Sequence, residues 1–216
     1  MDIEKFKRLP ILGIMRGIDV ESVEPLVEAL ISAGLKTVEI TMNTRGAAAL
    51  IEKAVATSGK RLTIGAGTVL SVKSLETAME AGATFIVTPV LVEEVMKHCV
   101  KNKIPVFPGA LTPSEIYNAW NAGATMVKVF PAGVFGPKYL KEIKGPFNDI
   151  RLLACGGVTP DNMKDYFSSG ASAVAFGEGV FKREWLAGKD FKSVGDAVKS
   201  YVNAFENASQ NRKEGV

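Results

Sequence analysis

The segment TPSEIYNAWNAGATMVKVFP, residues 112–131, contains one complete unit of a helix followed by a strand. Thr112 can cap a helix, the proline after it suits the first helical position, and Glu115 completes a capping box. Gly123 stands where a helix ends in a left-handed residue. The apolar run Met126–Phe130 is typical of a strand that is covered on both faces. The segment therefore predicts a capped helix that leads into a buried strand.

The same pattern recurs along the chain. Eight apolar runs begin about 20 to 26 residues apart, which is the length of one strand plus one helix. Glycines suited to a helix end precede every second run, and a further helix start is predicted at Thr159-Pro160-Asp161. The runs are Ile11–Met15, Thr37–Ile40, Leu62–Ile64, Thr84–Val87, Ile104–Phe107, Met126–Phe130, Leu152–Ala154 and Ala173–Phe176, and the glycines are Gly34, Gly82, Gly123 and Gly170.

Eight parallel strands that alternate with helices predict a (β/α)8 TIM barrel. An open doubly wound sheet is the alternative, because a repeat period does not by itself show closure. No GxGxxG motif follows the first run, so a dinucleotide-binding fold is not indicated. A length of 216 residues fits one barrel domain over residues 1–216, with the polar tail 207–216 expected to be frayed.

Composition excludes several classes of protein. The formal net charge is only +3 and the charges are interspersed, so neither nucleic acid nor a membrane surface is expected as a partner. The longest uncharged stretch has 12 residues, short of the roughly 20 that cross a bilayer, and the N-terminus lacks the apolar core of a signal peptide. The two cysteines, Cys99 and Cys155, form no CxxC motif, which predicts a cytoplasmic protein without a zinc site or a disulfide framework.

Polar residues at strand ends are the candidates for chemistry, because barrel active sites lie at the carboxyl ends of the strands. Lys128 is the one lysine of 19 that lies inside an apolar run. Its stem can be buried while its ammonium reaches solvent or pairs with a carboxylate. Alternatively, desolvation lowers the pKa of its amine so that it can attack a carbonyl group. Glu39, the acid within another apolar run, is either a partner for Lys128 or a proton shuttle beside it.

Glycines at the last two strand ends indicate a phosphate site. Gly156 and Gly157 follow the seventh run, and Gly177-Glu178-Gly179 follows the eighth, where many barrels bind phosphate through backbone N–H groups. Ordinary turn chemistry is the alternative reading for these glycines and for the loop that ends in Thr68. Cys155 either faces the site or is a small buried residue. The only histidine, His98, falls in a predicted helix, and no cluster of metal ligands is present, so histidine-based and metal-dependent chemistry are disfavoured.

Several motifs together resemble the KDPG/KHG aldolase family, whose substrates are 2-keto-3-deoxy-6-phosphogluconate and 4-hydroxy-2-oxoglutarate. They appear in order between about Pro10 and Phe205: Val38-Glu39-Ile40-Thr41, Gly65-Ala66-Gly67-Thr68-Val69, Phe107-Pro108-Gly109 with Thr112-Pro113-Ser114-Glu115, Lys128-Val129-Phe130-Pro131-Ala132, and Gly156-Gly157-Val158.

The resemblance implies a (β/α)8 class I aldolase, usually a homotrimer, that cleaves phosphorylated 2-keto-3-deoxy sugar acids to pyruvate and glyceraldehyde 3-phosphate without a metal or other cofactor. By this resemblance Lys128 matches the Schiff-base lysine and Glu39 the acid and base. Thr68 matches the residue that hydrogen-bonds the pyruvoyl carboxylate. The remaining matches are Pro89 and Phe130 as walls of the pyruvate end, and Gly156, Gly157, Gly177, Glu178 and Gly179 as the phosphate loops.

Two positions depart from the best-known gluconate pattern. Asn43 stands in place of an arginine, and Cys155 in place of a threonine near the sugar hydroxyls. Arg16 is expected to supply the missing cation to the substrate carboxylate by a bidentate contact. Family members that act on the galactonate epimer are similar to this chain in Arg16, Asn43 and Phe135-Gly136-Pro137. The sequence therefore leaves open whether the substrate is the gluconate or the galactonate epimer.

Two other functions remain as alternatives. One is a phosphate-binding barrel isomerase or synthase, in which Lys128 would bind an anion and form no imine. The other is a phosphosugar-binding barrel without catalysis, which the changed residues at positions 43 and 155 make conceivable. Retention of both Lys128 and Glu39 argues against the second alternative, because binding alone does not require that buried pair.

Overall fold

A single parallel sheet runs through the protein. The structure, a computed structural model, describes residues 1–213. The strands are β1 (Ile11–Met15), β2 (Thr37–Thr41), β3 (Thr63–Gly67), β4 (Ile86–Val87), β5 (Val106–Phe107), β6 (Gly109–Ala110), β7 (Val127–Val129), β8 (Leu152–Cys155) and β9 (Ala171–Phe176). Their order in the sheet is β5-β4-β3-β2-β1-β9-β8-β7-β6, with every pair parallel. Each of the eight predicted apolar runs contains or overlaps one strand.

Pro108 explains why nine strands appear where eight were predicted. The fifth run, Ile104–Phe107, contains β5, and the strand continues past it as β6; proline has no N–H group to donate to a neighbouring strand, so Pro108 separates the two pieces. β5 pairs with β4, and β6 pairs with β7. The carbonyl oxygen of Pro108 itself accepts a hydrogen bond of 2.8 Å from the backbone N–H of Lys128. The two pieces therefore act as one barrel strand that joins β4 to β7, which confirms the (β/α)8 barrel and excludes the open sheet.

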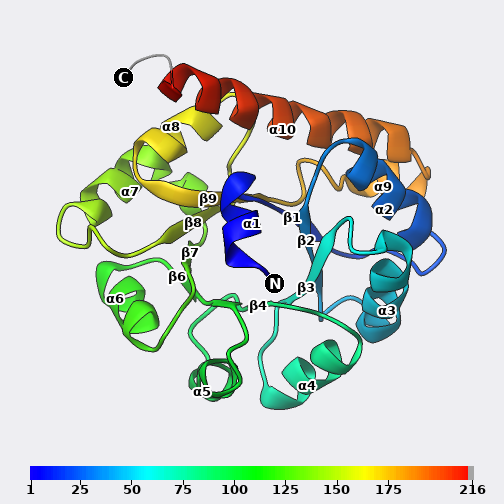
Figure 1. Cartoon of the computed structure of the whole chain (residues 1–216), viewed down its shortest axis with the longest axis horizontal. Coiled ribbons are helices and arrows are strands. Elements are labelled where there is room, and N and C mark those ends of the chain that lie inside the picture. Colours follow the sequence, from blue (N-terminus) through cyan, green and yellow to red (C-terminus); the bar gives the residue numbers. More distant parts are fainter. Residues whose placement is uncertain (214–216) are drawn as a thin grey trace.

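Helices surround the barrel (Figure 1). Those that follow the strands are α2 (Val23–Ser32), α3 (Ala47–Ser58), α4 (Val72–Glu80), α5 (Glu93–Lys101), α6 (Pro113–Asn121), α7 (Gly136–Lys144), α8 (Met163–Ser168), α9 (Arg183–Ala187) and α10 (Phe191–Lys213), with a 3-10 turn at Ala132–Val134. The capping box at Thr112 forms as predicted. The four helix-ending glycines all have φ between 90° and 97°. In the described residues, no helix is both long enough and apolar enough to span a membrane.

Two details of the helices differ from the sequence predictions. The regular helix α8 begins at Met163, four residues after Thr159, although Thr159 and Asn162 do exchange the two side-chain to backbone hydrogen bonds of a capping box and the Met163 N–H donates to the Thr159 carbonyl oxygen. The last helix, α10, continues to Lys213 and so includes most of the segment expected to be a frayed tail. The expected tail at residues 214–216 lies outside the described residues.

Side chains on alternate strand positions divide the core into two parts. Residues that face outward, such as Val38 and Ile40, pack against the helices in the larger core. Residues that face inward fill the barrel, among them Leu12, Phe107 and Leu153. Lys128 lies two positions after the inward-facing Met126, so its side chain also points into the barrel.

A short helix before β1, α1 (Ile3–Arg8), closes the barrel at the amino ends of the strands. Figure 1 shows α1 across the middle of the ring of strands. The ring of Phe6 is 2% exposed and lies 6.1 Å from that of Phe107, which in turn lies 5.7 Å from that of Phe85. Burying one phenylalanine side chain contributes roughly 1.5–3 kcal/mol. The amino end is thus an apolar plug, and the polar interior residues lie toward the carboxyl end.

Candidate active site

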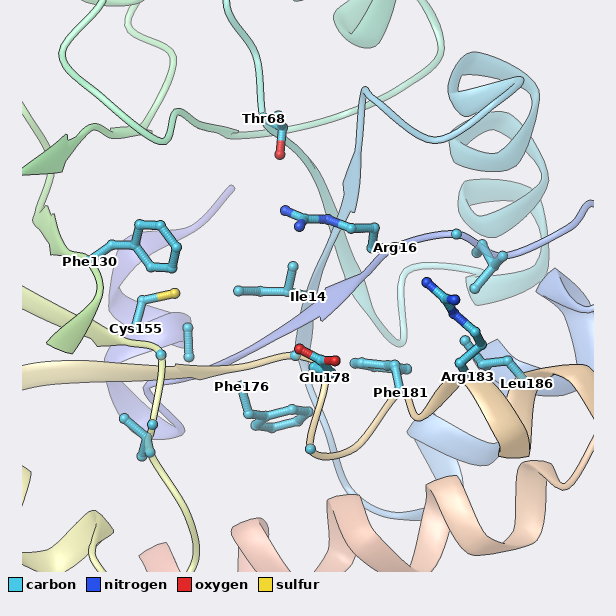
Figure 2. Close-up of a pocket in the computed structure, with 18 of the residues that line it drawn as sticks. Ile14, Arg16, Thr68, Phe130, Cys155, Phe176, Glu178, Phe181, Arg183 and Leu186 are labelled. Atoms are coloured by element: carbon cyan, nitrogen blue, oxygen red, sulfur yellow. The ribbon is translucent and has the colours of Figure 1, made fainter. Parts of the chain in front are cut away.

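A cavity of about 800 Å³ opens at the carboxyl ends of the strands (Figure 2). Most residues that the sequence nominated lie on its wall, although they come from six different strands or strand ends. Those residues are Arg16, Thr68, Pro89, Lys128, Phe130, Cys155, Gly156, Gly157, Gly177, Glu178 and Gly179. Barrel closure therefore gathers into one place the residues that had stood out from an apolar background.

Lys128 occupies the middle of β7, with Gly109 opposite it on β6 and Leu153 opposite it on β8. Its side chain is 8% exposed, and its ammonium nitrogen lies 5.4 Å from the centre of the Phe130 ring. Among the ion pairs of the described residues, none includes Lys128. The amine is therefore held at the cavity wall without a direct carboxylate partner, as a nucleophile requires.

Glu39 lies on β2, between Ile14 of β1 and Gly65 of β3, and is 1% exposed. Burial raises the pKa of its carboxyl group, and the charges of Lys128 and Arg16 oppose that rise. Its Oε2 atom is buried without a hydrogen-bond partner among the described residues. An unsatisfied buried oxygen costs about 1–3 kcal/mol, and such groups call for an explanation beyond stability.

Gly67 on β3 provides the space that Glu39 occupies. A Cβ atom at position 67 would lie 2.2 Å from Glu39 Oε1, closer than real Cβ contacts permit. The backbone of β3 can therefore approach the carboxyl group only because position 67 carries no side chain. Gly67, in the glycine-rich segment before Thr68, is therefore required for close packing against Glu39.

Thr68 and Arg16 project into the cavity from one side and face Phe130 and Cys155 across it (Figure 2). Thr68 has a φ of 55°, a left-handed conformation that is a clear outlier for a β-branched residue. Such strain is found where the surroundings hold a side chain in a functional position. The charge of Arg16 acts on both Glu39 and Cys155, which places a permanent cation near the buried acid.

Cys155, at the end of β8, is buried, and burial raises the pKa of its thiol to about 11 against the opposing charge of Lys128. A thiol with that pKa is protonated at neutral pH, and the thiolate is the reactive form of cysteine. Cys155 therefore offers a small, weakly hydrogen-bonding surface beside Lys128 and does not compete with the amine for a carbonyl group.

A model of one protein family matches residues 3–197, and its description is KDPG and KHG aldolase. The chain belongs to the KDPG/KHG aldolase family. The chain is 33% identical over 204 residues to the 2-dehydro-3-deoxy-6-phosphogalactonate aldolase of Escherichia coli strain K12, an alignment that covers 94% of this chain and 98% of that one. It is 38% identical over 161 residues to the 2-dehydro-3-deoxy-phosphogluconate aldolase of Pseudomonas aeruginosa, covering 74% and 71% of the two chains.

Solved structures agree with the family. A native KDPGal structure superposes with a TM-score of 0.87 at 33% identity and covers 94% of this chain and 97% of that one. A KDPG aldolase from Legionella pneumophila, with pyruvate captured as a covalent carbinolamine, gives a TM-score of 0.82 at 26% identity, with 89% and 93% of the two chains covered. A thiamine phosphate pyrophosphorylase from Pyrococcus furiosus gives 0.72 at 17% identity, over 94% and 98% of the chains, and shares the fold alone.

The aldolase cavity continues past the reactive residues to a distal end, which we define as Asp19, Ser22, Gly177-Glu178-Gly179 and Arg183. Gly156 lies next to Phe130, because a Cβ atom there would be 3.6 Å from the Phe130 ring, and Gly156 and Gly157 have φ of 87° and 78°. A Cβ on Gly157 would lie 2.7 Å from the Cα atom of Gly133, so this turn needs glycine both for its conformation and for close packing. The glycine turns are therefore structurally required whether or not they hold a phosphate.

The sequence did not single out Asp19, Ser22 or Arg183 as part of this aldolase site. Arg183 is exposed and begins the short helix α9, so the sequence showed only a charged residue in a charged stretch. Ser22 is 2% exposed, and its hydroxyl has no hydrogen-bond partner among the described residues. The loop after β1 brings Asp19 and Ser22 to the cavity, and the path of the chain after β9 brings Arg183 there.

Two predicted site residues, the buried Glu39 and the substrate-binding candidate Asn43, are not among the residues that line the cavity. Asn43, in contrast to Glu39, is exposed in the turn after β2. The neighbouring Thr44 accepts a hydrogen bond of 3.1 Å from the backbone N–H of Gly17 and shares another, of 3.0 Å, with the Thr41 hydroxyl. The turn is thus tied to the loop after β1, which carries Arg16, while the Asn43 side chain lies at the surface.

Two further expectations concern histidine and metals. His98 lies on α5, half-buried and away from the main cavity, as the sequence predicted. Across residues 1–213, no group of three or more histidine, cysteine, aspartate or glutamate side chains is arranged to hold a metal ion.

Proposed function

We propose that this protein is a class I aldolase that cleaves 2-keto-3-deoxy-6-phosphogluconate, or its galactonate epimer, to pyruvate and glyceraldehyde 3-phosphate. The observation that carries the proposal is the pair formed by Lys128 and Glu39: a cavity-facing amine without an ion-pair partner, whose charge acts on a buried carboxyl group with a free oxygen. The curated relatives named for these two activities, in Escherichia coli and Pseudomonas aeruginosa, support the substrate class.

The first half of the reaction forms the imine. The Lys128 amine adds to the C2 ketone of the substrate, and the carbinolamine loses water when Glu39 donates a proton to the departing hydroxyl. A raised pKa suits Glu39 to this step, because the carboxyl group is then protonated over a wider pH range. The Legionella pneumophila relative, with pyruvate captured as a carbinolamine, supports this route.

The second half breaks the C3–C4 bond. Glu39, now a carboxylate, accepts the proton of the C4 hydroxyl directly or through a water, and the aldehyde leaves. The bonding electron pair moves toward the positively charged nitrogen, which produces an enamine on Lys128. Protonation at C3 and hydrolysis of the imine then release pyruvate. Lysine provides the electron-accepting group in this scheme, so the reaction needs no metal or other cofactor.

The substrate is expected to lie along the cavity with its carboxylate near Arg16 and Thr68. Arg16 provides a cation, and Thr68 a hydroxyl, on the side of the cavity that faces Phe130 (Figure 2). A guanidinium group can bind a carboxylate through two parallel hydrogen bonds. Pro89 and Phe130 bound the methyl side of the pyruvoyl group, and Cys155 lies beside the sugar hydroxyls. The backbone of Gly156 and Gly157, together with Arg183, is available to the phosphate.

Neither alternative from the sequence is favoured. A barrel synthase or isomerase without an imine would resemble the thiamine phosphate pyrophosphorylase and 3-hexulose-6-phosphate synthase structures, which share 17% and 13% identity with this chain. A binding protein without catalysis would not require both a cavity-facing amine at Lys128 and a buried carboxyl group at Glu39.

We also propose that the enzyme is a homotrimer in the cytoplasm. Val90, Val134 and Phe135, on the loops that follow β4 and β7, are each more than half exposed, which supports an apolar contact surface between copies. Both cysteines are free and buried, as in proteins of reducing compartments. Sedimentation equilibrium of the purified protein tests the trimer, and a monomer at micromolar concentration contradicts it.

Borohydride trapping tests the proposed function. The purified protein is reduced with borohydride in the presence and absence of pyruvate and is then examined by intact mass and peptide mapping. We expect one pyruvate-derived adduct on Lys128, no adduct in Lys128→Ala, and an unchanged adduct in the control Lys138→Ala, whose lysine is exposed on α7. Absence of an adduct from the folded wild-type protein overturns the aldolase assignment.

A further inference from the structure

The distal end of the cavity carries negative charge where a phosphate site is expected. Glu178 stands between Gly177 and Gly179, and Figure 2 shows its carboxylate directed into the pocket. Asp19 lines the same end, where the backbone N–H of Ser22 donates a hydrogen bond of 2.8 Å to its carboxylate and lowers the pKa of that group. Arg183 is the cation of this end.

No ion pair among the described residues neutralises Glu178, Asp19 or Arg183. Two acidic side chains and one basic side chain therefore line the distal end, where the charge of Lys189, outside the lining, also acts on Asp19. Lys128 and Arg16, in contrast, line the reactive end near one buried glutamate. A phosphate held by the N–H groups of residues 177–179 lies within a few ångströms of the Glu178 carboxylate. Like charges at such distances repel, so Glu178 opposes a dianion.

A carboxylate is, in contrast, a good partner for hydroxyl groups. An ionised carboxylate only accepts hydrogen bonds, and its two oxygens can accept from two adjacent hydroxyls of a sugar chain. The hydrogen bonds formed with a charged acceptor are stronger than those between neutral groups. Glu178 thus fits the hydroxyl-bearing tail of a sugar acid better than it fits a phosphate.

We propose that Glu178 is a specificity-determining residue that reads the hydroxyls of the substrate tail, and that the enzyme also cleaves unphosphorylated 2-keto-3-deoxy sugar acids. This inference rests on the proposed function, because it uses the same imine on Lys128. The C3–C4 bond breaks, its electron pair passes to the enamine, and the C4 hydroxyl loses its proton to become the aldehyde of glyceraldehyde. Protonation at C3 and hydrolysis release pyruvate, so no further reactant is needed.

The experiment measures pyruvate release from four substrates: the 2-keto-3-deoxy acids of gluconate and galactonate, and the 6-phosphate of each. The proteins are the wild type, Glu178→Gln, and the control Glu184→Gln, which removes one negative charge from an exposed residue of α9 that does not line the cavity. Glutamine has nearly the same shape as glutamate, so the first variant changes the charge and the hydrogen-bonding pattern without opening space. Pyruvate trapping on Lys128 shows that each variant keeps its reactive end.

We expect the wild type to cleave at least one unphosphorylated acid. In Glu178→Gln, kcat/KM for the matching phosphorylated acid should rise while that for the unphosphorylated acid falls, so that their ratio increases about tenfold or more. The control should change the ratio less than twofold. The effect should shrink at high salt, because the charge of an exposed carboxylate is screened.

Two results overturn the inference while leaving the proposed function intact. One is a wild type that cleaves a phosphorylated acid and neither unphosphorylated acid. The other is a ratio that changes as little in Glu178→Gln as in Glu184→Gln. Failure of the wild type to release pyruvate from any of the four acids, or to trap pyruvate on Lys128, instead overturns the proposed function and the inference with it.

Discussion

The two ends of the barrel are built on opposite principles. At the amino end, Phe6, Phe85 and Phe107 form an apolar plug in which every side chain is buried. At the carboxyl end, Glu39 has an unsatisfied buried oxygen and Thr68 is in a left-handed conformation. Each of those two features costs of order 1–3 kcal/mol.

The residues that stabilise the fold and the residues that act on substrate therefore lie at opposite ends of the barrel. The plug contributes burial energy and closes the barrel, while the opposite end retains strained and unsatisfied groups that only a bound substrate could use. Substitutions at the amino end should therefore lower stability and leave the catalytic constants unchanged. Substitutions at the carboxyl end should lower activity and leave stability unchanged or improved.

Removal of the amine at the carboxyl end has the largest expected effect. Lys128→Ala should lower kcat for aldol cleavage by about 10³-fold or more, because no other cavity residue can form an imine. Thermal unfolding should show a protein at least as stable as the wild type, since a buried ammonium without an ion partner is lost. Retention of full cleavage activity by Lys128→Ala contradicts the role of this end.

Truncation of the plug tests the other end. Phe6→Ala should lower the free energy of unfolding by about 3 kcal/mol, as large-to-small core substitutions do, with kcat unchanged at temperatures where the protein is folded. Chemical denaturation and steady-state kinetics measure the two quantities. Lys7→Ala, on the exposed side of α1, is the matched control and should change neither. A fall in kcat without a fall in stability would show that the two ends are coupled.

Glu39→Gln should reduce kcat by about 10²-fold or more, because the proton transfers lose their acid and base. Burial raises the pKa of Glu39, so the stability from its protonated form is complete below the unfolded pKa and is lost as the pH rises through the folded one. The variant should match the wild type near pH 4 and equal or exceed it near pH 8. Unfolding curves at both pH values check the sign, and a variant that is less stable at pH 8 refutes it.

Gly67→Ala should act on catalysis through Glu39. The added methyl group meets Glu39 Oε1, and the carboxyl group must move away from its position. We expect kcat to fall by about tenfold, consistent with misplacement of a catalytic group, and the pH dependence of kcat to shift. Gly195→Ala on α10 is the control, because its Cβ meets Ala29 only at ordinary distances of 3.6 and 3.7 Å. An unchanged pH profile in Gly67→Ala would remove Gly67 from the catalytic argument.

Arg16→Ala has the smallest expected effect of these substitutions. Loss of a bidentate cation should raise the dissociation constant for pyruvate by about tenfold, while the trapped adduct on Lys128 still forms at saturating pyruvate. Isothermal titration or trapping at graded pyruvate concentrations measures the constant. An unchanged dissociation constant would show that the carboxylate is bound without Arg16.

Much of this architecture was readable from local patterns. The strands were predicted because a strand covered on both faces must be continuously apolar, and the helix ends because glycine adopts a left-handed conformation at low cost. Lys128 and Glu39 were found for the converse reason, since a charged side chain is unexpected inside a strand that is otherwise continuously apolar. These signals lie within a few residues of each other and need no knowledge of the fold.

Other features had no local signal. α1 is an ordinary short helix until its Phe6 meets Phe107, about 100 residues away in the chain. Asn43, in a turn, and Arg183, at the start of a short helix, are both exposed polar residues, yet Asn43 lies outside the cavity and Arg183 on its wall.

The sequence by itself determined which residues could carry the reaction and which segments would form the barrel, because both depend on the chemistry of neighbouring positions. The tertiary structure alone decided which of those residues share a cavity, how deeply Glu39 is buried, and that a carboxylate at Glu178 faces the distal end. Those properties follow from barrel closure and from the path of the loops. They depend on contacts between residues that are far apart in the sequence, and a local sequence pattern holds no information about such contacts.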